Sequence, residues 1–366
     1  MNTLPLHPLH GCWDLAASAI RAEALDTALA LNLFDALVEP MTAAELAHSQ
    51  GLHAANTAHL LELLWTLGLL QRERTEQATE QVPDRYALAP VARECLVRNA
   101  PGFCGDAWRY RLTSLRGLAG RLRAHVEQGP QLPENTFQSA TGAGWAAAAR
   151  AQIGQEQRAV SAAAALDIMD RLPQVQQARR LLDLGGGPGW IAIELARRFP
   201  GLRGVVFDWP ETAAVAQENI EASGLAERLR AQGGDVASDA LVDGEGKGAG
   251  EGFDLVWCSS VLHFVPDIAA VLAKVMAAMA PGGLFVCVHA ELPATAEEAA
   301  QVMPFYLPMR MVGRHVLPEG GTAAALAEAG FVEILQFGSG RFPMSPVRVA
   351  VARKPKAPGD PMAAHD

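Results

Sequence analysis

A cluster of glycines that follows a short apolar run has the residue types and spacing of a cofactor-binding turn. The leucines around Asp183 predict a buried parallel strand, and the residues after it include Gly185, Gly187 and Gly189. Apolar residues at helical spacing then predict a helix over 190–199. Glycines at such a turn let the main chain approach a ligand closely, and a helix N-terminus presents unpaired N–H groups. The pattern therefore predicts a nucleotide-type cofactor site at a switch point of a doubly wound α/β sheet.

The spacing of these glycines narrows the choice of cofactor. A dinucleotide-binding turn has the pattern Gly-x-Gly-x-x-Gly, in which the third glycine would fall on Trp190. A phosphate-binding loop has Lys followed by Ser or Thr, and this pair does not follow the glycines here. The turn therefore argues against a nicotinamide, a flavin or a nucleoside triphosphate.

Acidic residues follow the next predicted strands in chain order. Asp208 ends the strand 204–207, about twenty residues past the glycines, where a carboxylate can accept hydrogen bonds from both hydroxyls of a ribose. Asp235 follows a helix over 211–222 and could accept a hydrogen bond from the amine of an adenine ring. The candidate cofactor-binding residues are Asp183, Gly185, Gly187, Gly189, Asp208, Trp209, Gly234, Asp235, Val236, Cys258 and Ser259.

With these motifs the chain resembles the class I S-adenosylmethionine-dependent methyltransferases. It is most similar to the O-methyltransferase family that includes plant phenolic enzymes and bacterial natural-product tailoring enzymes. The resemblance covers almost the whole chain and rests on the segments 182–189, 207–211, 233–236, 261–263 and 281–283. It implies S-adenosylmethionine as the cofactor and an α/β, Rossmann-like domain with a seven-stranded sheet. The last hairpin of that sheet would be antiparallel, and the segments 330–337 and 347–353 suit it.

The N-terminal third has a different pattern: residues 13–98 are mostly helical, and two short strands could form a β-wing over 70–88. Thr42 with Glu45 three residues later predicts a capping box at one helix start. The order of elements is a winged-helix pattern, so a DNA-binding regulator has to be considered. However, the helix around 59–67 that would contact bases is almost wholly apolar and carries no Arg or Lys. This argues against DNA, and the family resemblance implies an intertwined homodimer instead.

These patterns predict four parts of the chain. They are a winged-helix-like dimerisation domain at 1–100, a helical bridge and pocket wall at 101–170, a cofactor-binding catalytic domain at 171–353 and a flexible tail at 354–366.

Composition limits the cellular partners. The formal charge of −10 and the pI near 5.5 argue against nucleic acid as a partner. Five cysteines without paired spacing favour a reducing compartment. We find no basic, signal-like N-terminus and no apolar run long enough to span a membrane. The sequence therefore predicts a soluble cytoplasmic enzyme with a small-molecule substrate and no membrane partner.

A histidine after the fourth predicted strand is the candidate catalytic base. The resembled family has Leu-His-Asp-Trp here, and its His removes the proton from a phenol; His263 occupies that position. An imidazole titrates near neutral pH, which suits abstraction of a proton from an acidic hydroxyl. Phe264 and Val265 replace the family's Asp-Trp, and His289 stands where the family has Glu. The carboxylate expected to orient the base is therefore missing unless Glu291 reaches it, and His289 is a second candidate for base or ligand.

A second histidine suggests a different chemistry. His315 lies in the segment 309–316, and two histidines over one pocket could hold a metal through imidazole nitrogens. Arg310 and Arg314 could pair with a carboxylate. The pair His263 and His315 resembles metal-dependent C-methyltransferases that act on the β-carbon of α-keto acids. Alternatively, His315 caps a helix end and the arginines form a solvated helix face.

Three functions follow from these alternatives. The leading hypothesis is C-methylation of a 2-keto acid chelated by iron or zinc, which would stabilise the enolate, in biosynthesis of a β-methyl amino acid. The second is metal-free O-methylation of a phenol, with His263 as general base. The third is a binding module without catalysis, which the complete cofactor motif disfavours. The candidate substrate-contacting residues are Trp108, Trp145, Phe305, Arg310 and Arg314.

Overall fold

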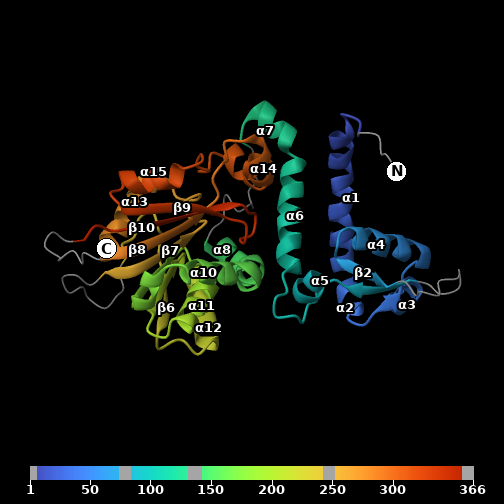
Figure 1. The fold of residues 1–366 in the computed structure, drawn as a ribbon, viewed down its shortest axis with the longest axis horizontal. Helices are drawn as coiled ribbons and strands as arrows, with labels where there is room; N and C mark the ends of the chain where they lie inside the picture. The colour runs from blue at the N-terminus through green and yellow to red at the C-terminus, as the bar shows by residue number, and fades with distance from the viewer. Residues whose placement is uncertain (1–5, 74–83, 131–141, 242–251, 357–366) are drawn as a thin grey trace. The chain divides into compact units, whose positions relative to one another are not determined.

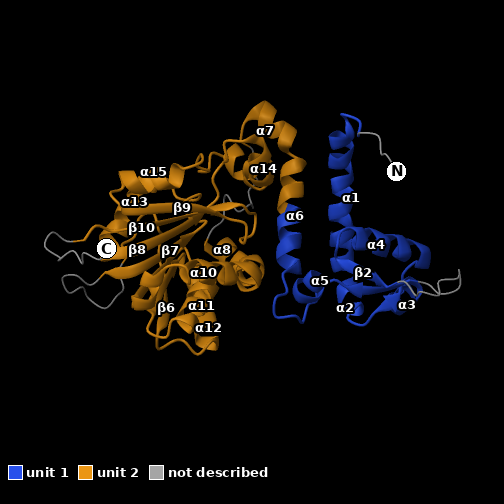
Figure 2. Ribbon diagram, viewed as in Figure 1, with its two compact units in different colours: residues 1–113 blue, residues 114–366 orange. Residues whose placement is uncertain are grey.

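The structure is a computed structural model that describes residues 6–73, 84–130, 142–241 and 252–356 (Figure 1). The chain divides into two compact units, 1–113 and 114–366, which Figure 2 colours separately. The boundary falls inside helix α6 (Gly105–Ala119) and within the predicted bridge. The predicted tail lies outside the described residues from position 357 onward.

The first unit is mostly helical, as predicted, with a small antiparallel sheet in the order β1-β3-β2. Its helices are α1 (His10–Ala30), α2 (Leu33–Ala36), α3 (Ala43–Gln50), α4 (Ala54–Thr66) and α5 (Pro90–Cys95). Its strands are β1 (Met41–Thr42), β2 (Leu70–Glu73) and β3 (Arg85–Leu88). The capping box of Thr42 and Glu45 is present at the start of α3. Helix α4 buries Leu61 and Leu64 in the core of this unit, so the helix that would contact DNA serves packing instead.

The second unit contains the predicted seven-stranded sheet, in the order β6-β5-β4-β7-β8-β10-β9. The strands are β4 (Arg180–Leu184), β5 (Arg203–Asp208), β6 (Leu229–Gly233), β7 (Phe253–Ser259), β8 (Met279–His289), β9 (Val332–Ser339) and β10 (Val347–Arg353). The first five are parallel, and β10 pairs antiparallel with both β8 and β9. Chain order reverses beside β4, whose neighbours are β5 and β7, and this is where ligands bind in sheets of this type.

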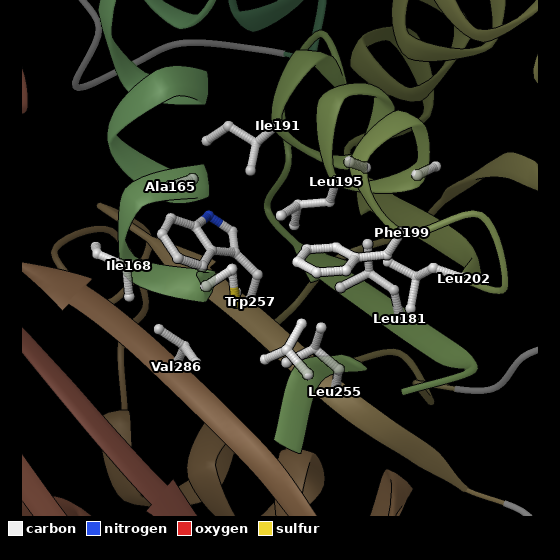
Figure 3. Close-up of a cluster of buried hydrophobic side chains, with 14 of the residues drawn as sticks. Ala165, Ile168, Leu181, Ile191, Leu195, Phe199, Leu202, Leu255, Trp257 and Val286 are labelled. Atoms are coloured by element: carbon white, nitrogen blue, oxygen red, sulfur yellow. The ribbon is translucent and has the colours of Figure 1, made fainter. Parts of the chain in front are cut away.

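Helices cover both faces of this sheet, as parallel strands require. They include α10 (Ala162–Met169), α11 (Trp190–Arg198), α12 (Pro210–Ala222), α13 (Ile268–Ala278) and α15 (Gly321–Glu328). Because side chains alternate along a strand, Leu181 and Leu182 of β4 belong to two different apolar clusters. In the first cluster, Trp257 of β7 packs with Ile168 of α10 and Leu195 of α11 (Figure 3). The second cluster contains side chains of α13 and α15. This double burial fixes the strand ends that carry the candidate site.

The remaining helices of the second unit precede β4 or follow β8. They are α7 (Leu122–Gln128), α8 (Gly142–Ala148), α9 (Gly154–Glu156) and α14 (Ala296–Met311), with a 3-10 turn over Pro173–Gln177. Two π-helical segments, Ala149–Ile153 and Gln157–Ser161, flank α9. Such segments are rare in proteins, and those that occur often lie at functional sites. Among the described residues, no helix has the length and apolarity needed to cross a membrane.

Candidate active site

The glycine-rich turn lies between β4 and α11 and has the backbone conformation that its composition predicts. Gly185, Gly187 and Gly189 have φ values of 64°, 59° and 80°, in the left-handed region that favours glycine. A Cβ added at Gly185 would lie 2.4 Å from Cγ2 of Val261, and one added at Gly186 would also collide with its surroundings. The turn therefore requires glycine for both its conformation and its close packing.

Asp208, at the end of β5, is tied directly to this turn. Its Oδ2 accepts a hydrogen bond from the Gly187 N–H at 2.8 Å, and its Oδ1 accepts one from the Trp209 N–H at 2.7 Å. Burial raises the pKa of Asp208 to about 6, although the two N–H groups oppose that rise. Each oxygen keeps a further lone pair, so the carboxylate can still accept hydrogen bonds from the hydroxyl groups of a ligand.

Asp183, near the end of β4, is the second carboxyl group at the turn and is 1% exposed. Its Oδ2 has no hydrogen-bond partner within the part of the chain that the structure describes. Burial, and then the charge of Asp208, raise the pKa of Asp183 to about 7. Two acidic groups in this environment favour a ligand that brings positive charge or hydroxyl donors.

The other predicted cofactor residues lie at neighbouring strand ends. Gly234 donates its N–H to the Asp208 carbonyl at 2.9 Å, which joins the end of β6 to the end of β5. Asp235 follows it and accepts a hydrogen bond from the Ala237 N–H at 2.8 Å. Trp209 is 42% exposed at the same edge. Val236 packs partly against the second apolar cluster, and Cys258 lies inside that cluster, fully buried, while Ser259 ends β7. The turn, Asp208, Trp209 and Asp235 thus share one edge of the sheet, whereas the Cys258 side chain packs in the core.

A residue that the sequence analysis missed is Gln157, in the second π-helical segment. Its Oε1 accepts the Trp190 N–H at 3.0 Å, and its Nε2 donates to the Gly186 carbonyl at 3.1 Å. Asn219 of α12 also holds the turn, because its Nδ2 donates to the Pro188 carbonyl at 2.8 Å. Nothing in the local sequence around Gln157 indicates this contact with a turn 29 residues away.

His263 lies in the loop after β7 and is 1% exposed. Its Nδ1 lies 2.5 Å from the main-chain carbonyl oxygen of His315. A carbonyl oxygen only accepts, so Nδ1 carries the proton and the lone pair of the neutral ring lies on Nε2. That Nε2 is buried and has no hydrogen-bond partner among the described residues. Burial lowers the pKa of His263 to about 4, and the His315 carbonyl opposes this effect only in part. The ring is therefore a neutral proton acceptor whose accepting atom is available.

His289, at the end of β8, packs beside His263 with 4.1 Å between ring centroids. Its Nε2 accepts the Leu262 N–H at 2.9 Å, so its own proton lies on Nδ1. Burial, and then the neighbouring His263, hold the pKa of His289 well below its ordinary value. The ring of Tyr306, from α14, lies 5.3 Å from the His263 ring. His263 is thus packed beside the rings of His289 and Tyr306.

Glu291 does not supply the carboxylate that might have oriented the base. Its two oxygens accept hydrogen bonds from the Gly320 N–H, the Thr322 N–H and the Gln336 side-chain amide, at 2.7 to 2.9 Å. Glu291 therefore caps the start of α15. The orienting acceptor for His263 is the His315 carbonyl instead.

The structure does not support His263 and His315 as a pair of metal ligands. The contact between them uses the main chain of His315, and the His315 ring turns its Nε2 toward the Pro266 carbonyl, 3.4 Å away. Within residues 6–73, 84–130, 142–241 and 252–356, no group of three or more metal-ligating side chains occurs. The chelation of a keto acid by iron or zinc at this pair thus has no structural support.

The two arginines also have other contacts than those predicted. Arg314 donates from Nη1 to the Phe264 carbonyl at 3.0 Å, and its guanidinium lies 5.8 Å from the centroid of the Phe264 ring. Arg310 places Nη1 3.3 Å from the sulfur of Met303. Since α14 ends at Met311, the two arginines do not share a helix face, contrary to the expectation.

Of the predicted substrate-contacting aromatics, Trp145 is connected to His263 through the ring of Phe264. Its ring meets Phe264 edge to face at 5.1 Å, and Phe264 meets His263 in the same manner at 6.3 Å. Phe305 lies on α14 and is 37% exposed. Trp108 packs against the apolar core of the first unit. The structure therefore brings Trp145 into the surroundings of His263.

Known proteins share these features. The O-methyltransferase domain matches residues 122–331, and the O-methyltransferase dimerisation domain matches residues 13–98. The chain is 28% identical to the tetracenomycin polyketide synthesis 8-O-methyl transferase of Streptomyces glaucescens, over 92% of this chain and 94% of that protein. It is 30% identical to the N,N-dimethyltransferase OxyT of Streptomyces rimosus, over 78% of this chain and 80% of that protein. Human N-acetylserotonin methyltransferase, solved in complex with SAM, matches with a TM-score of 0.74 at 20% identity, covering 97% of this chain and 100% of that chain, which shows the shared fold.

Proposed function

The chain belongs to the O-methyltransferase family of S-adenosylmethionine-dependent methyltransferases, and we propose that it methylates a hydroxyl group of a small phenolic acceptor. One observation supports this choice of reaction: the buried Nε2 of His263 bears a lone pair and has no hydrogen-bond partner among the described residues. A positioned neutral imidazole of this kind is suited to take the proton from a hydroxyl as the oxygen is methylated.

The turn and the strand ends fit S-adenosylmethionine, which supplies an electrophilic methyl group on a sulfonium centre. We assign Asp208, which accepts the Gly187 N–H, to the ribose hydroxyls and Asp235 to the adenine amine. The raised pKa values of Asp183, about 7, and Asp208, about 6, indicate that a cationic ligand is favoured there. The chain's own contribution is to hold the cofactor in register with the acceptor, since orientation supplies a large part of the rate.

The surroundings of His263 favour an acidic hydroxyl over an aliphatic alcohol. Its Nδ1 partner is a neutral carbonyl, and the ring of His289 beside it is neutral as well. A carboxylate partner would stabilise the imidazolium that forms on proton transfer, and Glu291 is turned away. A phenol gives up its proton much more readily than an alcohol does, so we propose a phenol or another acidic hydroxyl as the acceptor.

We consider C-methylation of an α-keto acid a less well supported alternative to this O-methylation. It requires iron or zinc on His263 and His315, whose contact uses the main chain of the second residue. Relatives named as O-methyl transferases support oxygen as the atom that accepts the methyl group. OxyT is named as an N,N-dimethyltransferase, so nitrogen is the alternative accepting atom to test.

We further propose that the protein works as a homodimer. The matched dimerisation domain supports this assembly, and so do exposed apolar side chains along α1, which include Trp13, Leu15 and Ile20. A helix that leaves such side chains in water is unusual for a monomer, because burying them against a second copy is favourable.

The test is a methyl-transfer assay on the full-length protein with S-adenosylmethionine and separate panels of phenols, anilines and 2-keto acids. We expect S-adenosylhomocysteine to form with phenols, and proton NMR to place the new methyl group on oxygen. Transfer to keto acids that stops on chelation of metals would overturn the proposal in favour of C-methylation. Transfer to anilines alone would move the accepting atom to nitrogen.

A further inference from the structure

We propose that Gln157 is a positioning residue that holds the glycine-rich turn in its cofactor-binding shape. The proposal rests on the S-adenosylmethionine-dependent reaction described above, and it assigns a role to a residue outside the cofactor motifs. Gln157 lies in a helical segment that precedes β4, yet its side-chain amide contacts the turn after β4 at two points.

The two hydrogen bonds of Gln157 reach two different places: the first residue of the helix after the turn, and the turn itself. Its Oε1 accepts the N–H of Trp190, the first residue of α11, at 3.0 Å. Its Nε2 donates to the carbonyl of Gly186, inside the turn, at 3.1 Å. One amide thus links the turn to the helix that follows it.

The first of these bonds gives a partner to an N–H group at the start of a helix. The first N–H groups of a helix have no partner within the helix and must find one elsewhere. At the start of α11, Gly189 offers no side chain that could cap the helix. Gln157 accepts the Trp190 N–H from a distant segment, so this donor is satisfied by the protein and its direction is fixed before a ligand binds.

An amide side chain can make both bonds at once without a change of protonation state. The Trp190 N–H needs an acceptor and the Gly186 carbonyl can accept a second donor beside the Gly189 N–H, and a glutamine side chain supplies one of each. A carboxylate of the same size would place an oxygen against the carbonyl oxygen. Alanine would leave the part-buried Trp190 N–H without its acceptor, and the Gly186 carbonyl would keep only the hydrogen bond that it accepts from the Gly189 N–H at 3.1 Å. The chemistry therefore explains why glutamine, and not merely a residue of that size, stands at 157.

The surrounding contacts show that the whole segment covers the turn. Ile153 Cγ2 and Gln157 Nε2 both lie 3.5 Å from the position that a Cβ on Gly187 would occupy. Arg158 places its guanidinium 5.1 Å from the centroid of the Trp190 ring. Ile153 ends the first π-helical segment and Gln157 begins the second. The π-helical geometry is thus located where the helix meets the turn.

A turn fixed before binding loses less conformational freedom when the cofactor enters. Removing Gln157 should therefore weaken cofactor affinity more than it weakens the fold. Because S-adenosylmethionine and S-adenosylhomocysteine share the parts that contact this edge of the sheet, both affinities should fall together.

The experiment measures the dissociation constants of S-adenosylmethionine and S-adenosylhomocysteine by isothermal titration calorimetry, which needs no acceptor, together with Tm. We expect Gln157→Ala to weaken both by about 10-fold, the loss typical of one unpaired hydrogen-bonding group. Gln217→Ala is the matched control, since the Gln217 amide also makes two bonds, to the Ala231 N–H and to Glu221, both at 2.9 Å, away from the turn. Its affinities should stay within about twofold of wild type.

A second variant separates positioning from general structure. In Gln157→Glu the ionised carboxylate repels the Gly186 carbonyl, whereas the protonated acid can donate to it and still accept the Trp190 N–H. The affinity of this variant, divided by that of wild type at each pH, should therefore rise as the pH falls from 8 to 5.5. Division by wild type is needed because Asp183 and Asp208 titrate in the same range, and Glu156 and Arg158 flank the substituted position.

The outcomes distinguish the two proposals. If wild type binds neither ligand, the S-adenosylmethionine-dependent function fails. If wild type binds but Gln157→Ala binds within twofold of it, or loses no more than Gln217→Ala does, the role of Gln157 is overturned. A Gln157→Glu ratio that does not change with pH would also overturn it.

Discussion

The Nδ1–H of His263 donates to the main-chain carbonyl oxygen of His315, 2.5 Å away and 52 residues later in the chain. This single contact fixes the tautomer of the ring and leaves Nε2 as the accepting atom. It also replaces the carboxylate that family resemblance had led us to expect beside the base.

Replacement of the base should abolish most of the turnover without affecting cofactor binding. We expect His263→Ala to lower kcat by at least about 100-fold, the usual contribution of a positioned general base. The affinity for S-adenosylmethionine, measured by calorimetry, should be unchanged because the described partners of the His263 ring are His315, His289, Phe264 and Tyr306, and none of them belongs to the turn. His59→Ala, at a highly exposed histidine of α4, is the control and should match wild type in both. A His263→Ala enzyme with more than a tenth of wild-type kcat would remove His263 from the reaction.

The side chain of His315 should matter little, since its contact with His263 uses the main chain. We expect His315→Ala to keep kcat within about threefold of wild type, as for a change that leaves the catalytic contact in place. Incubation with a chelator should also leave the rate unchanged. Loss of activity in this variant together with loss of bound iron or zinc, measured by mass spectrometry, would instead support the metal-dependent reaction.

A carboxylate placed next to the base should change its pH dependence in a predictable direction. In His289→Glu the new negative charge would stabilise the imidazolium form of His263 and so raise its pKa from about 4. The acidic limb of the kcat/KM profile should therefore move to higher pH, and weakly acidic phenols should become better acceptors relative to strongly acidic ones.

His289→Ala is the companion to this substitution. It removes the acceptor of the Leu262 N–H and should lower both Tm and kcat without moving the acidic limb. If His289→Ala shifts the acidic limb as much as His289→Glu does, the negative charge of the glutamate is not the cause of the shift.

Cofactor binding should strengthen as the pH rises through the range in which Asp208 and Asp183 ionise. Burial raises the pKa of these groups to about 6 and about 7, above the value near 3.9 expected for an unfolded chain. The folded protein without cofactor therefore retains protons that the unfolded chain has lost, and the stability these groups contribute is lost as the pH rises from about 4 to 7. A cationic cofactor with hydroxyl donors favours the ionised forms, so its binding should release protons.

Calorimetry in buffers of different ionisation enthalpy, at pH 5.5, 6.5 and 7.5, measures that release. Asp208→Asn should bind more weakly at pH 7.5 and show a smaller dependence on pH, whereas Asp14→Asn, at an exposed aspartate of α1, should behave as wild type on both counts. An affinity that is constant across this range in wild type would contradict the coupling.

Trp145 should contribute to the choice of acceptor. Its ring reaches the base through Phe264, so we expect Trp145→Ala to raise the KM for the phenolic acceptor several-fold, by about 1 kcal/mol for one lost aromatic contact, and to leave cofactor affinity unchanged. Phe305→Ala tests the second predicted aromatic in the same assay. An unchanged acceptor KM in Trp145→Ala would exclude this residue from the acceptor site.

The sequence by itself determined the sheet domain and its cofactor edge. Strand alternation, helical spacing and the positive φ values of Gly185, Gly187 and Gly189 depend on local sterics, so a single sequence carries them. The same holds for the capping box at Thr42 and for Asp208, which comes at a fixed distance after the turn. The family motifs extended these local signals to the order of the strands and the identity of the cofactor.

Only the tertiary structure decided which partner each buried polar group found. Glu291 caps α15, His289 accepts the Leu262 N–H, and the His315 carbonyl takes the proton of His263. Gln157 reaches the glycine-rich turn from another segment. Each contact joins residues 27 to 52 positions apart, and its geometry depends on how strands and helices pack against one another. A side chain's type defines what it can donate or accept, but packing selects the one group that lies within hydrogen-bonding distance.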